Sequence, residues 1–341
     1  MARTALDGLL VADFSRVLAG PLCSQNLGDL GADVIKVERP GAGDDTRQWG
    51  PPFVAEGSTY YLSLNRNKRS LVLDLRDPAD LELARVLCTR ADVVLESFRP
   101  GTMERHGLGY ETVRERNPGV VYTSISAFGS GPATRELPGY DLLVQAMCGY
   151  MSITGEPDGR PMKPGTALID MLTGLYATIG TLAALQARAR DGHGQHVEVS
   201  LMDTGLAALL GLASSYLNTG EVPHRSGNRH PSIAPYETFA AAGGDLAIAG
   251  GNDAIFERLC DVLERPALAR DPRFATNAAR VAHRDELAAE LEAALARRPA
   301  AEWAERLNAA GVPAGPVNDV AQGFALAERL GIGPVLELDG V

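Results

Sequence analysis

A single carboxylate, Asp170, stands in a stretch that carries no other charge between Lys163 and Arg188. Burying it without partners would cost several kcal/mol, so it must be held by partners, exposed to solvent or used in a reaction. The apolar residues that follow recur with helical spacing and predict a helix that begins near Asp170. A carboxylate there could be the helix N-cap, or a nucleophile that the helix N-terminus keeps ionised. The spacing leaves both interpretations open.

Basic residues recur at the ends of predicted strands or in the loops that follow, at the edge where open parallel sheets bind their ligands. These residues are Arg16, Arg39, Arg76, Arg99 and Arg105. Each could be an ordinary surface arginine. Several at one edge of a protein with a net charge of −11 nevertheless favour a ligand that carries phosphate.

Other familiar catalytic patterns are absent from the sequence. There is no GxxxxGK before Ser or Thr, no GxSxG and no HExxH, and the turn RVLAGP has one glycine where a dinucleotide site would have three. The six histidines have no carboxylate or cysteine at ligand spacing, so we expect no metal site. Tyr140 and Asp141 open a predicted helix, where a packed ring and a favourable first-turn charge explain them without catalysis.

The elements that would position these groups alternate between strand and helix over the first 130 residues. Strand-like runs occupy 8–15, 33–40, 70–77, 92–101 and 120–129, and helical spacing occupies 20–32 and 78–91. This alternation predicts an α/β fold with roughly four parallel strands joined by crossovers. A further strand is expected in GQHVEVSLMD, 194–203.

The rest of the chain predicts a smaller α+β unit. Residues 222–235 are rich in turn formers and suggest a domain boundary, and 237–251 reads as a hairpin that turns at Gly243-Gly244. Amphipathic helices are expected over 252–263, 284–297 and 300–311. We therefore predict a large domain over 1–221, a smaller one over 222–325, and a final segment over 326–341.

Composition bounds the partners and the compartment. A net charge of −11 argues against a general nucleic-acid or anionic-membrane surface, since both require clustered Lys and Arg. Scattered cysteines, at positions 23, 88, 148 and 260, are expected to be buried thiols of a cytoplasmic protein. The N-terminus lacks a secretory signal pattern, and no uninterrupted apolar run reaches the length of a membrane span.

Seven stretches together resemble the class III coenzyme A transferases, which include formyl-CoA transferase and carnitine CoA-transferase and are related to the α-methylacyl-CoA racemases. They cover most of the chain in the family's order: RVLAGPLCSQNLGDLGADVIKVERPGAGDDTR, NRNKRSLVLDLRDP, ESFRPGTMERHGLGYE, GYDLLVQAMCGYMSITGEPDGRPMKPG, DMLTGLYATIGTLAAL, GHGQHVEVSLMD and AGVPAGPVNDV. The resemblance implies a large Rossmann-like domain built from both chain ends, a smaller domain, and an interlocked homodimer whose active site lies between one large domain and the partner's small domain.

The resemblance also implies a reaction. Asp170 occupies the position of the family's nucleophile, which forms a mixed anhydride and then an aspartyl-CoA thioester. Gly250, Gly251 and Asn252 resemble the glycine loop that closes over these intermediates and excludes water. The implied substrates are an acyl-CoA and a small carboxylic acid, without a permanently bound cofactor.

Contacts to coenzyme A carry over residue by residue, to Arg16, Val17, Ala19, Arg39, Leu73, Arg76, Ser97, Phe98 and Arg105. Three departures from the family pattern stand out. Ser97 replaces a common asparagine, Pro138 stands where formyl-CoA transferase has a lysine, and the chain ends some tens of residues early, so we expect the return to the large domain to be shortened.

Two alternatives to CoA transfer remain. A racemase shares the resemblance and exchanges an α-proton with a His-Asp pair, where this chain has Tyr140 followed by Asp141. The tyrosine is the transferase-like residue, so Tyr140 is counted with the catalytic candidates. A relative that binds acyl-CoA without turnover would also keep the arginines.

Overall fold

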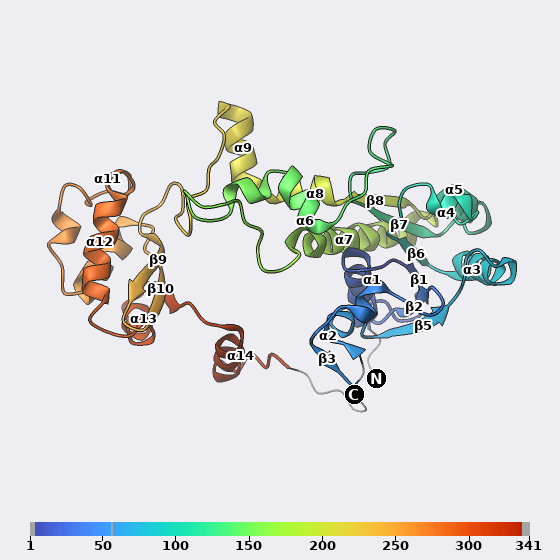
Figure 1. The fold of residues 1–341 in the computed structure, drawn as a ribbon, viewed down its shortest axis with the longest axis horizontal. Coiled ribbons are helices and arrows are strands. Elements are labelled where there is room, and N and C mark those ends of the chain that lie inside the picture. Colours follow the sequence, from blue (N-terminus) through green and yellow to red (C-terminus); the bar gives the residue numbers. More distant parts are fainter. Residues whose placement is uncertain (1–3, 56, 336–341) are drawn as a thin grey trace. The chain divides into compact units, whose positions relative to one another are not determined.

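The computed structural model describes residues 4–55 and 57–335, and they fold as two compact units (Figure 1). One unit contains the described residues up to Thr154 together with Arg160–His224. The other contains Gly155–Gly159 and the described residues from Arg225 onward. No feature of the sequence predicted that the short segment Gly155–Gly159 belongs with the second unit.

A six-stranded parallel sheet forms the centre of the first unit, in the order β5-β2-β1-β6-β7-β8. The strands are β1 (Leu10–Phe14), β2 (Asp33–Glu38), β5 (Lys68–Val72), β6 (Val93–Glu96), β7 (Val121–Ser126) and β8 (His196–Ser200). The chain runs outward from β1 to β5, returns to the other side of β1, and continues from β6 to β8. The order therefore reverses between β1 and β6, the kind of switch point where open α/β sheets bind ligands.

Helices cover both faces of this sheet and confirm the predicted α/β fold (Figure 1). On one face, α1 (Ala19–Asp29) and α7 (Leu168–Asp191) share an apolar core with Val11 and Val93. On the other face, α3 (Pro78–Arg90), α4 (Thr102–Arg105) and α5 (Tyr110–Arg116) share a core with Ala12 and Val94. Neighbouring residues of one strand thus enter opposite cores, as the two-residue period of a strand requires.

Shorter elements complete the first unit. They are β3 (Phe53–Val54), β4 (Gly57–Ser58), α2 (Thr59–Leu62), α6 (Asp141–Met147), α8 (Leu201–Ala208) and α9 (Leu210–Thr219), with 3-10 helices at Asp45–Gln48 and Tyr150–Ile153.

The second unit packs helices on a three-stranded antiparallel sheet. Strands β9 (Tyr236–Ala241) and β10 (Gly244–Ala249) form the predicted hairpin, with Gly243 at its turn in the left-handed region (φ 75°), and β11 (Ala314–Pro316) pairs with β10. The helices are α10 (Asp253–Val262), α11 (Asn277–Ala282), α12 (Arg284–Leu295), α13 (Ala300–Ala309) and α14 (Val320–Arg329), with a 3-10 helix at Leu268–Arg270.

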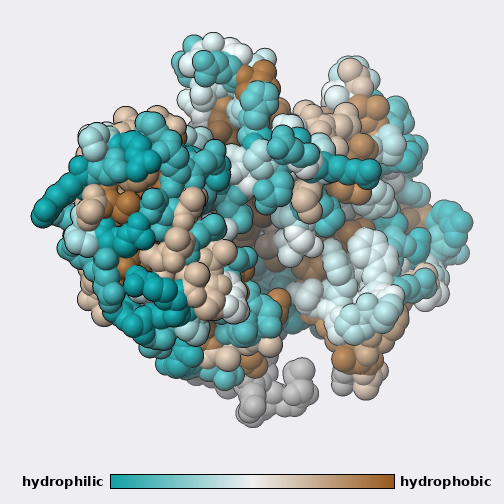
Figure 2. All heavy atoms as spheres, turned by 60° about the vertical axis from the view of Figure 1, so that its left-hand side comes forward, coloured by the Kyte–Doolittle hydropathy of each residue, from teal (hydrophilic) through white to brown (hydrophobic). Residues whose placement is uncertain are grey.

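Apolar side chains of the sheet, α10, α12 and α13 form the core of this unit around Trp303. The outer face of its helices is mainly hydrophilic in Figure 2, as the amphipathic spacing predicts. The expected shortened return over 326–341 lies partly outside the described residues, which end at residue 335.

Helix α7 corrects one expectation about apolar segments. Despite Asp170, it is, within the described part of the chain, the one helix long and apolar enough to cross a membrane by length and composition. The core helix of a soluble protein passes the same test, and α7 contributes Ile169, Ala177 and Ala184 to the core on one face of the sheet. Its composition is therefore weak support for a membrane span.

Candidate active site

A cleft opens at the carboxyl ends of β1, β6 and β7, where the strand order reverses. The start of α1 and the residue before α6 also line it, and Asp170 reaches it from the first turn of α7. The lining residues are Arg16, Val17, Leu18, Ala19, Gly20, Asp45, Ser97, Phe98, Arg99, Pro100, Ile125, Ser126, Ala127, Leu137, Pro138, Gly139, Tyr140, Asp170 and Leu201.

Asp141 caps the helix that carries Asp170. Helix α7 begins at Leu168, so Asp170 lies inside the first turn, and the N-cap residue Ala167 makes no side-chain cap. One oxygen of Asp141, Oδ1, accepts the backbone N–H of Ile169 at 2.9 Å and that of Asp170 at 3.1 Å. The interpretation of Asp170 as the N-cap is therefore wrong, because a residue 29 positions earlier satisfies these donors.

Burial and, to a lesser extent, the nearby charge of Asp141 together raise the pKa of the Asp170 carboxyl to about 7. The sequence led us to expect that the helix N-terminus keeps this group ionised at neutral pH. The desolvation of a partly buried carboxylate next to a second carboxylate outweighs the helix dipole, so Asp170 titrates near neutrality.

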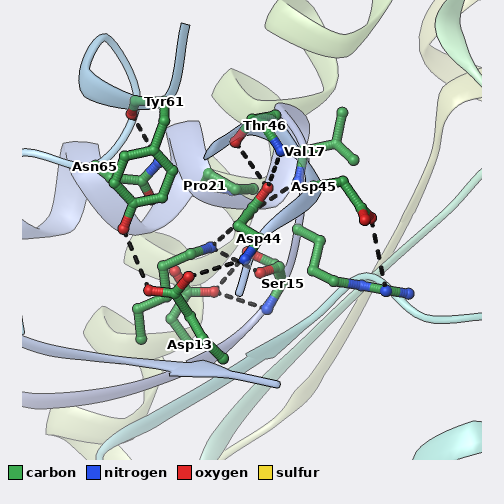
Figure 3. A network of polar contacts seen from close by, with 12 residues as sticks. Asp13, Ser15, Val17, Pro21, Asp44, Asp45, Thr46, Tyr61 and Asn65 are labelled. Carbon is green, nitrogen blue, oxygen red and sulfur yellow. Dashed lines mark hydrogen bonds and ion pairs between the residues drawn. The ribbon is translucent and has the colours of Figure 1, made fainter. Parts of the chain in front are cut away.

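A buried ion-pair network holds the loop between β1 and α1 (Figure 3). The Lys36 Nζ atom lies 2.9 Å from Asp44 Oδ2 and donates to the Ser15 carbonyl at 2.9 Å. Asp44 Oδ2 also accepts the Val17 N–H at 3.3 Å. Val17 has a φ of 71°, a left-handed conformation that is costly for a β-branched residue. The network thus supports a strained residue that lines the cleft.

The same network also includes Asp13, near the end of β1, and Lys68, at the start of β5. Asp13 is fully buried and accepts hydrogen bonds from the Ser15 and Ser24 hydroxyls, and Lys68 Nζ lies 3.5 Å from its Oδ2. Although burial opposes ionisation, the ammonium groups of Lys36 and Lys68 hold the pKa of Asp13 below its usual value. Burial lowers the pKa of Lys68 to about 8.

Eight candidate residues from the sequence line the cleft: Arg16, Val17, Ala19, Ser97, Phe98, Arg99, Tyr140 and Asp170. Pro138, noted as a departure from the family pattern, lines it as well. The Arg16 guanidinium lies over the Phe98 ring at 5.0 Å, and the backbone N–H of Arg16 donates to Ser97 Oγ at 3.0 Å. These contacts join the loops after β1 and β6, the two strands that flank the switch point.

The other candidates lie elsewhere. Arg39 pairs with Asp45, which lines the cleft. Leu73 is buried in the core, Arg76 is exposed and pairs with Asp74, and Arg105 donates to Thr102 within α4. Gly250, Gly251 and Asn252 connect β10 to α10 in the second unit.

Sequence patterns missed Tyr60 on α2. Burial raises the pKa of the Tyr60 phenol and the charge of Asp170 adds to this rise, although Tyr60 is not among the residues that line the cleft. The Tyr60 ring packs edge-on against Trp49 with centroids 5.2 Å apart. An aromatic pair flanking the turn Gly50-Pro51-Pro52 was the available signal, but it indicates packing as readily as a site.

Within residues 4–55 and 57–335, no group of three or more His, Cys, Asp or Glu side chains is placed to hold a metal ion. The candidate site contains a carboxylate, aromatic side chains and arginines that line the cleft. Such a site suits covalent chemistry on a ligand that carries negative charge.

The fold and the cleft define an α/β protein with a candidate ligand site at a topological switch point, and comparison with known proteins defines its class further. The family model of CoA-transferase family III matches residues 6–330. A succinate–glutarate CoA-transferase of Agrobacterium fabrum is 46% identical over 94% of this chain and 82% of its own. An acetyl-CoA:oxalate CoA-transferase of Acetobacter aceti is 44% identical over 98% of this chain and 86% of its own.

Solved structures agree. The CAIB/BAIF family protein from Brucella suis has a TM-score of 0.89 and 44% identity, covering 99% of this chain and 94% of its own. The chain belongs to CoA-transferase family III, which confirms the resemblance found in the sequence. It is a transferase that moves coenzyme A, and its substrates are CoA thioesters and carboxylic acids.

Proposed function

We propose that Asp170 is the nucleophile that carries coenzyme A between two carboxylic acids. The observation that supports this most directly is that the carboxylate lines the cleft while Asp141 caps α7 in its place. Capping therefore does not explain why a carboxylate stands in this apolar stretch. Covalent catalysis does explain it.

The proposed steps conserve charge and atoms. An Asp170 oxygen attacks the thioester carbonyl of the donor, and the C–S bond breaks to give a mixed anhydride and CoA thiolate. The thiolate attacks the Asp170 carbonyl, which releases the donor acid as a carboxylate and leaves an aspartyl-CoA thioester. The acceptor carboxylate reverses the two steps, so the new acyl-CoA leaves and the Asp170 carboxylate is restored.

Coenzyme A is proposed to lie along the loops after the strands. Arg16, Val17, Ala19, Ser97 and Phe98 have the strongest support, because they line the cleft that Asp170 enters. The further proposed contacts are Arg39, Leu73, Arg76 and Arg105. Tyr140, at the rim of the same cleft, is proposed to orient the reacting carboxylate.

Water must be kept from both acyl intermediates, since each hydrolyses to the free Asp170 carboxylate. We infer that Gly250, Gly251 and Asn252 close over the site during turnover. These three residues join a strand that ends at Ala249 to a helix that begins at Asp253. The Asn252 side chain caps that helix by accepting the Ile255 N–H at 2.8 Å.

The acids are inferred from the relatives. The names of two relatives specify succinate, glutarate and oxalate, which are all dicarboxylic acids. We therefore propose that at least one partner acid of this chain is a dicarboxylate.

We propose that the chain acts as an interlocked homodimer in the cytoplasm. Helix α7 exposes Met171, Leu175 and Ile179 at four-residue spacing, and α6 exposes Leu142 and Met147. Such an apolar surface favours a protein partner, and a second copy of this chain is the partner that the family resemblance implies. The four buried, free cysteines fit a reducing compartment.

Intact mass spectrometry tests the proposed function. With succinyl-CoA as donor, we expect wild-type protein to gain the mass of coenzyme A less one water, located on Asp170 by peptide mapping. Parallel incubation in deuterated water distinguishes the alternatives. Deuterium at the α-carbon of recovered thioester, without an adduct, would indicate a racemase; neither signal would indicate a binding protein.

The pH dependence of transfer follows from the raised pKa of Asp170. Only the ionised carboxylate is a nucleophile, so kcat/KM should be nearly constant above about pH 8 and fall tenfold per pH unit well below pH 7. Initial rates between pH 5 and 9 measure this limb. A fall in kcat/KM centred near pH 4 would contradict the assignment of Asp170, whose pKa is raised by burial, as the nucleophile.

A further inference from the structure

Arg280, on α11 of the second unit, is a fully buried cation that the proposed chemistry does not use. Its guanidinium donates three hydrogen bonds: Nε to the Ala234 carbonyl at 2.7 Å, Nη1 to the Phe274 carbonyl at 3.0 Å and Nη2 to Asp253 Oδ1 at 2.7 Å. It also lies over the Phe256 ring at 4.5 Å. A buried charge with this many fixed partners holds its neighbours in one arrangement.

Two of these acceptors stand at the two ends of the glycine loop, Gly250–Asn252. Asp253 follows Asn252 directly. Ala234 precedes Pro235, whose carbonyl accepts the Gly250 N–H at 2.8 Å. The Arg280 guanidinium therefore connects two places: Ala234, in the segment on which the loop begins, and Asp253, the residue that directly follows the loop.

The segment 230–234, next to the residue that accepts the Gly250 N–H, is also held by side chains of α11 and α12. Asn277 Nδ2 donates to the Ser232 carbonyl at 2.9 Å, and Arg284 Nη2 donates to the His230 carbonyl at 2.8 Å. Asn277 and Arg280 are three positions apart on α11, as neighbours on one helical face are, and Arg284 is the first residue of α12. Together they fix three carbonyls of the segment 230–234.

The two glycines pack closely against this segment, with little room for a side chain. A methyl group on Gly250 would lie 3.0 Å from Pro235 Cγ, and one on Gly251 would lie 3.0 Å from Ile233 Cγ2. The loop thus consists of small residues packed on a rigid support. Such a design allows a hinge motion while the hinge ends stay fixed.

We propose that Arg280 is the positioning residue of the glycine loop, holding both of its ends so that closure excludes water from the Asp170 intermediates. The inference rests on the proposed function, because it assigns Arg280 a role only if such intermediates form.

The test measures how the aspartyl-CoA thioester divides between water and acceptor. Water at its carbonyl releases CoA thiol and restores Asp170, whereas the acceptor carboxylate gives new acyl-CoA. We expect Asp253→Ala and Arg280→Lys to raise the ratio of hydrolysis to transfer about tenfold, while succinyl-CoA still forms the adduct. Asp253 is suitable because its side chain is 63% exposed, so its removal opens no cavity in the core.

Arg265→Lys and Glu290→Ala are the matched controls. They break another arginine–carboxylate pair of the second unit that does not touch the loop, and we expect them to keep the wild-type ratio. An unchanged ratio in Asp253→Ala, with adduct present, would overturn the role of Arg280 alone, even if Arg280→Lys did not fold. Absence of adduct in wild-type protein would instead overturn the proposed function and this inference with it.

Discussion

Replacing Asp170 with asparagine is expected to lower kcat/KM for CoA transfer by about 10⁴-fold or more, because the amide cannot form the anhydride or the thioester. Asparagine has nearly the same shape, and the residue lies in the first turn of α7, so the cleft is kept. Steady-state transfer from succinyl-CoA measures the loss, and intact mass should show no CoA adduct.

Measurements of stability distinguish this loss of transfer activity from unfolding of the variant. The folded-state pKa of Asp170 is raised from 3.8 to about 7, so between these values the folded protein binds more protons than the unfolded chain. The contribution of this group to stability therefore falls as the pH rises from about 4 to about 7. Asp170→Asn should then raise the free energy of unfolding by about 1–3 kcal/mol at pH 8 and have little effect at pH 4.

Asp191→Asn is the control, since Asp191 is exposed at the other end of the same helix. We expect it to keep transfer activity within a factor of about two of wild type. Substantial transfer by Asp170→Asn, measured in protein free of deamidated material, would contradict the nucleophilic role.

The sequence predicted those elements that follow from a periodic pattern of apolar residues. The alternation of strand-like and helical segments over the first 130 residues predicted the parallel sheet. The amphipathic spacing of apolar residues predicted α10, α12 and α13. The order of the strands was not accessible, because β1 pairs with both β2 and β6 through contacts that no local pattern records. Consequently the arginines after the strands could be assigned to one sheet edge, but not sorted into those at the switch point and those away from it.

Long-range polar partners were also inaccessible. The capping of α7 by Asp141 joins residues 28 and 29 positions apart, and only the folded chain shows that it frees Asp170 from this task. Lys36 stands in the strand sequence DVIKVE, where alternation suggests an exposed polar side chain. It is in fact 1% exposed, because the carboxylate of Asp44 meets it under the loop.

Lys36→Met should cost about 3–5 kcal/mol of the free energy of unfolding, because it leaves the buried Asp44 carboxylate without its cation. Urea denaturation at pH 7.5 measures this change. Arg69→Met removes an ion pair with Asp33 whose side chains are 66% and 53% exposed, and it should cost less than about 1 kcal/mol. Equal losses in the two variants would contradict a buried pair at Lys36.

The double variant Lys36→Met/Asp44→Asn separates the contribution of the pair to stability from its effect on the Val17 loop. Removing both charges should restore a large part of the stability, since no uncompensated charge then remains in the core. The asparagine cannot, however, reproduce the carboxylate that accepts from both Val17 and Thr46. We therefore expect the double variant to fold but to have an increased KM for acyl-CoA, because the strained Val17 loop that lines the cleft would relax. Recovery of stability with an unchanged KM would show that the pair supports the fold and not the loop.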